Sequence, residues 1–104
     1  MSNKYLVYFL CDAGISTSIM TAKMMEVVQT HDLPLDIEAH SVALADNFVQ
    51  QKAPALIVLG PQVKYLKDKV DKQFDCDVFV MDTNVYANLD AKTAVRDILN
   101  LLRQ

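Results

Sequence analysis

The clearest structural signal in the chain lies at residues 5–18, which read YLVYFLCDAGISTS. Its first part, Tyr5 to Leu10, is a solid apolar block rich in aromatic and branched residues and too short for a helix, so it predicts a strand buried on both faces. Small and polar residues follow from Cys11 to Ser18, and these can cap a helix. Apolar residues then recur at helical spacing from Ile19 to Val28. The stretch therefore predicts a strand, a polar loop and a helix in succession.

The rest of the chain repeats this alternation of strands and helices. Residues 35–40 alternate apolar and polar side chains, which is typical of a strand near a sheet edge, and residues 55–59 form a fully apolar block typical of a central strand. Residues 78–81 predict a last strand. Helices are expected at 43–51, 63–74 and 91–102, and residues 82–90 are expected to be a polar loop.

This element order predicts an α/β fold. Strands that alternate with helices imply a parallel sheet, because each right-handed crossover must place a helix over the apolar strands. We expect a small doubly wound domain, βαβαβαβα, with a four-stranded parallel sheet in the order 2-1-3-4 and helices on both faces. Since the chain has 104 residues, residues 1–104 are expected to form one domain.

Composition and charge argue against several function classes. A formal net charge of -3, with no run of like charges, makes nucleic acid an unexpected partner. The longest stretch without Asp, Glu, Lys or Arg is residues 53–63, whereas a membrane-spanning helix needs roughly 20 apolar residues. No secretory cleavage pattern follows the first apolar block, so we expect a cytoplasmic protein with reduced cysteines. His31 and His40 have no second ligand type at metal spacing, and we expect both to be solvated surface residues, with no metal site.

The chemistry is expected at the loop that follows the first strand. In doubly wound sheets, ligands bind beyond the carboxyl ends of the strands, at the switch point of the topology. Cys11 begins this loop, and backbone N–H groups at the start of a helix stabilise a phosphate oxygen or a thiolate. Cys11 is therefore a candidate nucleophile, which requires that solvent and alkylating reagents reach it. The alternative is a buried, inert thiol that ends an apolar strand.

Other familiar sites are missing from the sequence. There is no Cys-x-x-Cys pair, no Gly-x-Gly-x-x-Gly loop and no Gly-Lys-Ser/Thr loop, and Gly14 and Gly60 are the only glycines. Cys76 precedes the last strand whereas Cys11 follows the first, so the two thiols are expected about 15 Å apart at opposite ends of the sheet. A disulfide between them within one molecule is not expected.

Residues 11–18, Cys-Asp-Ala-Gly-Ile-Ser-Thr-Ser, resemble the phosphocysteine loop of the enzyme IIB components of the lactose/cellobiose (chitobiose) branch of the sugar phosphotransferase system. The segment Leu59-Gly60-Pro61-Gln62 and, after the last strand, Asp82, Tyr86 and Asp90 also look like family segments in the right order. The resemblance covers nearly the whole chain.

This resemblance implies a bacterial, cytoplasmic phosphocarrier, a protein-phosphohistidine–sugar phosphotransferase. Cys11 would take a phosphoryl group from a phosphohistidine of enzyme IIA and pass it to a sugar of the cellobiose, chitobiose or lactose class, held by the membrane enzyme IIC. Phosphoryl transfer of this kind needs positioning and charge stabilisation, so no cofactor or metal is required. We expect a monomer, because the loop must be presented to two partners in turn.

The resemblance also assigns the residues around the thiol. Backbone and hydroxyl groups would hold the phosphoryl oxygens, from Asp12, Ala13, Gly14, Ile15, Ser16, Thr17 and Ser18. Gly60, Pro61 and Gln62 would form a wall beside the loop, because the third strand should neighbour the first; the alternative is a plain turn that ends the strand. Tyr86 would shape the docking rim, or pack its ring across the sheet. Asp12 departs from the family loop, which usually has a small or neutral residue there, and its side chain is expected to turn to solvent.

The competing enzyme class is a hydrolase similar to the low-molecular-weight tyrosine phosphatases, which would also use Cys11. That class has a Cys-x5-Arg loop, and Thr17 stands where it has arginine. The chain also has no Asp-Pro pair to supply the general acid. A receiver-like signalling module, the third possibility, needs an acidic residue at the end of the third strand, where this chain has Gly60.

Overall fold

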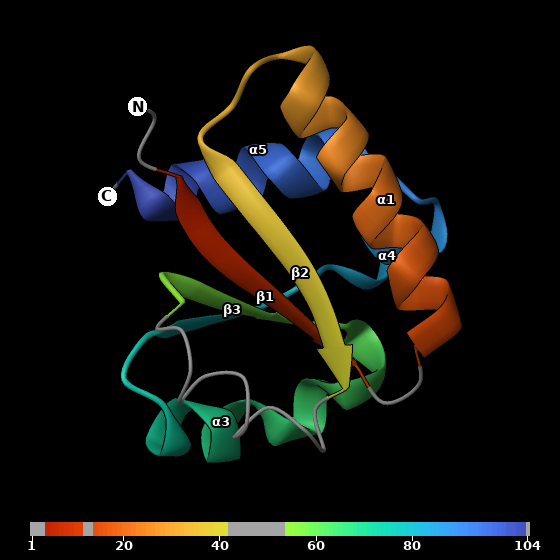
Figure 1. Cartoon of the computed structure of the whole chain (residues 1–104). Helices are drawn as coiled ribbons and strands as arrows, with labels where there is room; N and C mark the ends of the chain where they lie inside the picture. The colour runs from red at the N-terminus through yellow and green to blue at the C-terminus, as the bar shows by residue number, and fades with distance from the viewer. Residues whose placement is uncertain (1–3, 12–13, 42–53, 104) are drawn as a thin grey trace.

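The sheet has the predicted strand order. The computed structural model describes residues 4–11, 14–41 and 54–103, and for 14–17 it describes the backbone alone. Its strands are β1 (Tyr5–Cys11), β2 (Leu35–Ser41), β3 (Leu56–Leu59) and β4 (Asp77–Val80). They pair in the order β2-β1-β3-β4, and every pair is parallel (Figure 1). The α/β class and the order 2-1-3-4 are therefore confirmed.

Helices cover both faces of this sheet, as predicted. On one face lie α1 (Gly14–Thr30) and α5 (Ala91–Leu102), and on the other lie the 3-10 helix η2 (Pro61–Leu66) and α3 (Lys67–Gln73) (Figure 1). A short helix, α4 (Thr83–Ala87), follows β4. The expected helix at 43–51 lies outside the described residues.

The core is divided by the sheet into two apolar clusters, because successive side chains of a strand point to opposite faces. Val7 and Phe9 of β1 pack in the cluster beneath α1 and α5, whereas Tyr8 and Leu10 pack in the cluster beneath η2 and α3. All four are at most 1 % exposed. The central position of β1 thus explains why its sequence is apolar without alternation.

Three predicted boundaries were wrong, each for a local reason. The helix expected at 63–74 is the 3-10 helix η2 followed by α3, and within η2 the backbone of Val63 is non-helical (φ -116°, ψ 22°). The loop expected at 82–90 contains α4, because Oδ1 of Asp82 accepts hydrogen bonds from the backbone N–H groups of Asn84 (2.8 Å) and Val85 (3.2 Å) and so caps a helix. Finally, Gly14–Ser18 belong to α1 and not to the loop before it.

His40 is not the solvated residue that was expected. Its side chain is 17 % exposed, and its Nε2 lies 3.0 Å from Oε1 of Glu38. Its ring also packs edge-on against Tyr8, with ring centroids 5.0 Å apart. His31, by contrast, is exposed as predicted. The edge strand β2 thus uses one polar pair to cover the buried ring of Tyr8.

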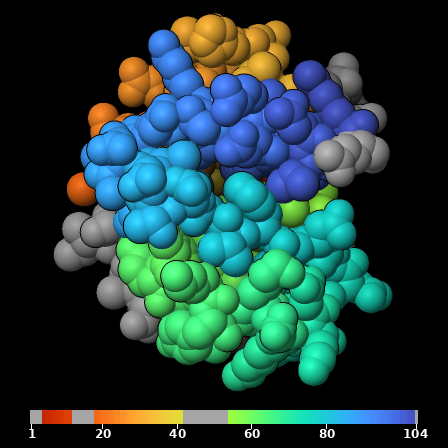
Figure 2. Space-filling model, turned by 180° about the vertical axis from the view of Figure 1, so that it is seen from behind, coloured from red at the N-terminus to blue at the C-terminus, as the bar shows by residue number. Residues whose placement is uncertain are grey.

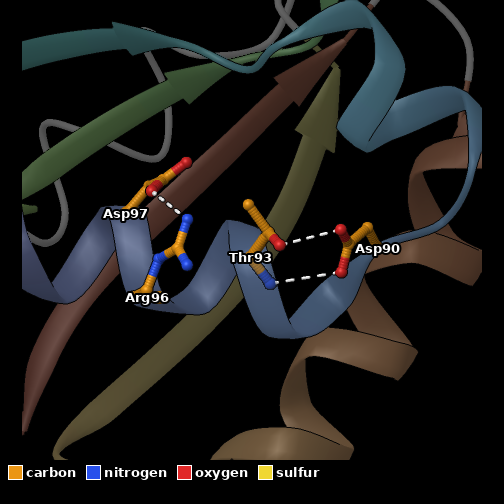
Figure 3. A network of polar contacts seen from close by, with 4 residues as sticks. All are labelled: Asp90, Thr93, Arg96 and Asp97. Carbon is orange, nitrogen blue, oxygen red and sulfur yellow. Dashed lines mark hydrogen bonds and ion pairs between the residues drawn. The ribbon is translucent and has the colours of Figure 1, made fainter.

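The start of α5 is fixed by Asp90 (Figure 3). Its Oδ1 accepts a hydrogen bond from the backbone N–H of Thr93 (3.3 Å), and its Oδ2 accepts one from the Thr93 hydroxyl (2.7 Å). These bonds, with smaller contributions from Arg96 and Lys92, hold the pKa of Asp90 below its usual value. A carboxylate at this position also interacts favourably with the helix dipole.

We expect Asp90→Ala to lower the thermal unfolding midpoint by a few degrees, and Asp90→Asn to lower it less, because asparagine keeps an oxygen that can accept from Thr93. Since folding lowers the pKa of Asp90, the advantage of wild type over Asp90→Asn should be complete at neutral pH and disappear as the pH falls through that lowered pKa. Unfolding curves at a series of pH values measure this difference. A difference that does not change on acidification would contradict the role of the charge.

Candidate functional site

The candidate site lies where the carboxyl ends of β1 and β3 meet. In the strand order β2-β1-β3-β4, β2 lies beside one edge of β1 and β3 lies beside its other edge. The connections after β1 and β2 therefore run in opposite directions, which places the switch point of the topology between β1 and β3. The backbone N–H of Gly60, just beyond β3, donates a hydrogen bond to the carbonyl of Leu10 (3.0 Å). Gly60 therefore lies next to Cys11, as the expected pairing of the first and third strands requires.

The lack of a side chain at Gly60 matters for local space and not for an unusual backbone angle. Its φ of -63° and ψ of 153° suit any residue. A Cβ atom at this position, however, would lie 2.6 Å from Oε1 of Gln62 and 3.7 Å from Cβ of Cys11. The missing side chain thus lets Gln62 fold back beside the end of β1. Pro61, half-buried, begins η2 and turns the chain away from the sheet.

Cys11 itself is 2 % exposed, so the solvent access expected of a nucleophile is not present in the described structure. Neither Cys11 nor Cys76 forms a disulfide. The strand register places them at opposite ends, since Leu10 pairs with Leu59 whereas Leu56 pairs with Asp77, next to Cys76. Burial, followed by the charges of neighbouring aspartates, raises the pKa of the Cys76 thiol. Cys76 is therefore poorly suited to act as a thiolate near neutral pH.

The predicted phosphate-binding residues divide into three groups. Asp12 and Ala13 lie outside the described residues. Gly14 to Thr17, which include Ile15 and Ser16, form the first turn of α1, and only their backbone is described. Ser18 is exposed on α1. Because the first four N–H groups of a helix have no partner within it, this end of α1 presents donors and partial positive charge just after Cys11.

Tyr86 packs across the sheet beside this site. It lies on α4, and its ring is edge-on to Phe9, with ring centroids 6.2 Å apart. Phe9 precedes Cys11 by two residues on β1 and therefore points to the same face. The contact fits the packing interpretation of Tyr86, and it joins α4 to the strand that carries the thiol.

An apolar hollow that the sequence did not predict lies next to Tyr86. Ile19, Tyr86, Ala87 and Leu89 line a space of about 240 Å³, and Ile19 and Leu89 are 48 % and 37 % exposed. Leu89 has a φ of 52°, in the left-handed region that costs a leucine about 1 kcal/mol or more. An apolar residue between Asn88 and Asp90 was the signal that could have revealed this hollow.

Neither a metal-binding cluster nor a membrane-spanning helix is found in the described part of the chain. No group of three or more His, Cys, Asp or Glu side chains that could hold a metal ion occurs in residues 4–11, 14–41 and 54–103. Within the same ranges, no helix is long and apolar enough to cross a membrane.

We expect Gly60→Ala to lower the free energy of unfolding by less than about 1 kcal/mol, because the end of the flexible Gln62 side chain can swing away from the new Cβ. In a Gln62→Ala background the same substitution should cost less still. A double-mutant cycle by urea unfolding measures this coupling. Equal costs in both backgrounds would show that Gln62 is not the group that Gly60 accommodates.

Known proteins that resemble this chain in sequence are IIB components of the sugar phosphotransferase system. A family model described as the PTS lactose/cellobiose-specific IIB subunit matches residues 6–97. The oligo-beta-mannoside-specific EIIB component of Bacillus subtilis (strain 168) is 31 % identical over 99 residues, which cover 92 % of this chain and 94 % of that protein. The galactose-specific EIIB component of Lactococcus lactis subsp. cremoris (strain MG1363) is 31 % identical over 80 residues, 74 % of each chain.

Solved structures show the same fold. The lactose-specific IIB component domain from Streptococcus pneumoniae has a TM-score of 0.77 at 16 % identity, over 93 % of this chain and 96 % of that one. The cellobiose-specific phosphotransferase IIB component from Borrelia burgdorferi has a TM-score of 0.77 at 16 % identity, over 96 % and 93 %. Sequence and fold together show that this chain belongs to the lactose/cellobiose-specific IIB family of the sugar phosphotransferase system.

Proposed function

We propose that this protein carries a phosphoryl group on Cys11, which it accepts from a phosphohistidine of an enzyme IIA and transfers to a sugar bound by a membrane enzyme IIC. The observation that carries the proposal is the position of Cys11 in a chain of the IIB family. The thiol ends a central strand at the switch point of the sheet and is followed by the first turn of α1. On this proposal residues 1–104 act as one domain, as a monomer in the bacterial cytoplasm.

The chemistry consists of two in-line transfers. In the first, the P–N bond of the phosphohistidine breaks while the Cys11 sulfur forms a P–S bond, and the imidazole leaves as a neutral ring once it has taken up the thiol proton. In the second, a sugar hydroxyl forms a P–O bond, its proton passes to a base, and the P–S bond breaks to regenerate the thiolate. Both steps need charge stabilisation more than covalent help, and backbone N–H groups at the start of α1 can supply it.

The environment of Cys11 favours a carrier over a hydrolase. A phosphatase of the competing class clamps the phosphoryl group with an arginine, but Thr17 occupies that position and both arginines of this chain, Arg96 and Arg103, lie at α5. Without that clamp, water attack on the thiophosphate lacks its main stabilising group. The sugar therefore remains the better acceptor.

The 2 % exposure of Cys11 is the observation that competes with this proposal, because a donor must reach the sulfur. A thiol that stays buried and inert would end an apolar strand without any chemical role. The decisive experiment must therefore detect the phosphoryl group on Cys11 directly.

After incubation with phosphoenolpyruvate and the upstream phosphocarriers, we expect intact-mass spectrometry to show one added phosphoryl group, located on Cys11 by fragmentation. The Cys76→Ser variant should be labelled as wild type is, since that thiol has a raised pKa and lies at the other end of the sheet. The Cys11→Ser variant should not be labelled.

Two results would contradict the assignment: label on a different side chain, or no label together with negligible alkylation of Cys11 at neutral pH. Hydrolysis of a small aryl phosphate should be negligible. Vigorous hydrolysis that Cys11→Ser abolishes would favour the phosphatase class.

The same proposal assigns a docking role to the apolar hollow of Ile19, Tyr86, Ala87 and Leu89. The hollow is connected to the strand of Cys11 through the contact between Tyr86 and Phe9. Transient partners bury modest areas, and exposed apolar side chains such as Ile19 and Leu89 suit that use.

The relatives named for oligo-beta-mannoside, galactose and cellobiose share this one family, so we assign the choice of sugar to enzyme IIC.

We expect Leu89→Gly to raise the KM for the phosphorylated donor protein in Cys11 labelling, because it removes an exposed apolar side chain beside the site. The substitution should maintain or increase stability, since glycine tolerates the positive φ of 52°. Asp32→Gly is the matched control, because Asp32 has the same φ and lies beyond the far end of α1. It should leave the KM unchanged, and an equal rise in both variants would exclude the hollow as a docking surface.

A further inference from the structure

A second groove lies between the end of α1 and the outer side of α5, away from Cys11. Its floor is apolar and consists of Val27, Leu33, Val95 and Leu99, and its volume is about 260 Å³. Figure 2 shows α5, in blue, crossing this face of the molecule with the end of α1 beside it. At a rise of 1.5 Å per residue, Val27 lies about 20 Å along α1 from the turn that follows Cys11. The groove is therefore not part of the site described above.

The rim of this groove is basic. Lys92, Arg96, Arg103 and His31 are exposed and line it, and no residue that lines it carries a carboxylate. The three basic residues Lys92, Arg96 and Arg103 stand out together in a chain of net charge -3. Carboxylates also occur close to this rim: Asp32 stands between His31 and Leu33, and Glu26 precedes Val27. On α5, Oδ1 of Asp97 lies 3.6 Å from a terminal nitrogen of Arg96 (Figure 3). Because Arg96 is 67 % exposed, that ion pair is weak and can exchange.

The basic residues follow one line along the helix. Lys92 and Arg96 are four residues apart, and Arg103 follows seven residues later, so all three share one side of α5. Along the helix axis they are separated by about 6 and 10 Å. Val95 and Leu99 lie next to this line and form part of the apolar floor. The groove thus presents an apolar stripe and a parallel basic stripe about three helical turns long.

We infer that this groove is a second binding site, which accepts an acidic amphipathic helix from a partner protein. Leucine-like side chains of the partner would fill the floor, and carboxylates at matching helical spacing would meet Lys92, Arg96 and Arg103. A membrane surface fits less well, because the apolar residues are recessed between two helices and do not project. A second copy of this chain also fits poorly, since Asp71 of α3 already pairs with Lys67, and Asp97 of α5 lies 3.6 Å from Arg96 of the same helix.

The test uses the full chain and a synthetic, end-capped helical peptide whose glutamates and leucines repeat the spacing of the basic and apolar residues of α5. We expect micromolar binding by calorimetry, with NMR shift changes centred on Val95 and Leu99. The same peptide with glutamine for glutamate, or with serine for leucine, should bind at least about tenfold more weakly.

The matched variants carry equal charge changes on exposed helices. Arg96→Glu/Arg103→Glu should weaken peptide binding by about tenfold or more, whereas Lys69→Glu/Lys72→Glu on α3 should not. Neither variant should change phosphoryl labelling of Cys11, so this result is independent of the proposed function. Equal weakening in both variants, shift changes at the Cys11 end, or tighter binding to phosphatidylglycerol vesicles than to the peptide would overturn the inference.

Discussion

The structure depends on one constraint: β1 is hydrogen-bonded on both edges and covered on both faces. A strand in that position must be apolar throughout, and the layers above and below it must be built by other parts of the chain. In this protein α1 and α5 form one layer, and η2 and α3 form the other. The burial of Val7 to Leu10 therefore connects α1, α5, η2 and α3 to one strand.

The same constraint places the candidate chemistry. A strand that is closed on all sides can offer reactive groups only at its end, and the carboxyl end of β1 coincides with the switch point of the topology. Cys11 occupies this end, with the backbone of Gly60 beside it and the first turn of α1 after it. The arrangement places the proposed nucleophile beside backbone donors, which suits the proposed carrier because it must neither bind its phosphoryl group too tightly nor lose it to water.

Surface features are distributed between two regions of the molecule. The apolar hollow of Ile19, Tyr86, Ala87 and Leu89 lies beside the strand that carries the thiol, and it is maintained in part by the unfavourable backbone of Leu89. The basic groove lies at the other end of α1. Because α1 extends from one region to the other, it separates the surface proposed for phosphoryl transfer from the groove proposed for a different partner.

The sequence by itself predicted the alternation of strands and helices, the parallel sheet and the position of Cys11, because unbroken apolar blocks and helical periodicity are local signals. The strand order followed from the edge pattern of residues 35–40 and the central pattern of residues 55–59. The family, too, could be identified from residues 11–18 together with the segment 59–62 and the residues after the last strand. Other features depended on the tertiary structure, since they arise between residues far apart in the chain. The burial of Cys11, the close approach of Gln62 to Gly60 and the ring contact of His40 with Tyr8 are examples. The apolar hollow and the basic groove also depended on the packed structure, because residues from separate elements line each of them. The periodicity within one helix does not specify which side chains of another element will lie beside it.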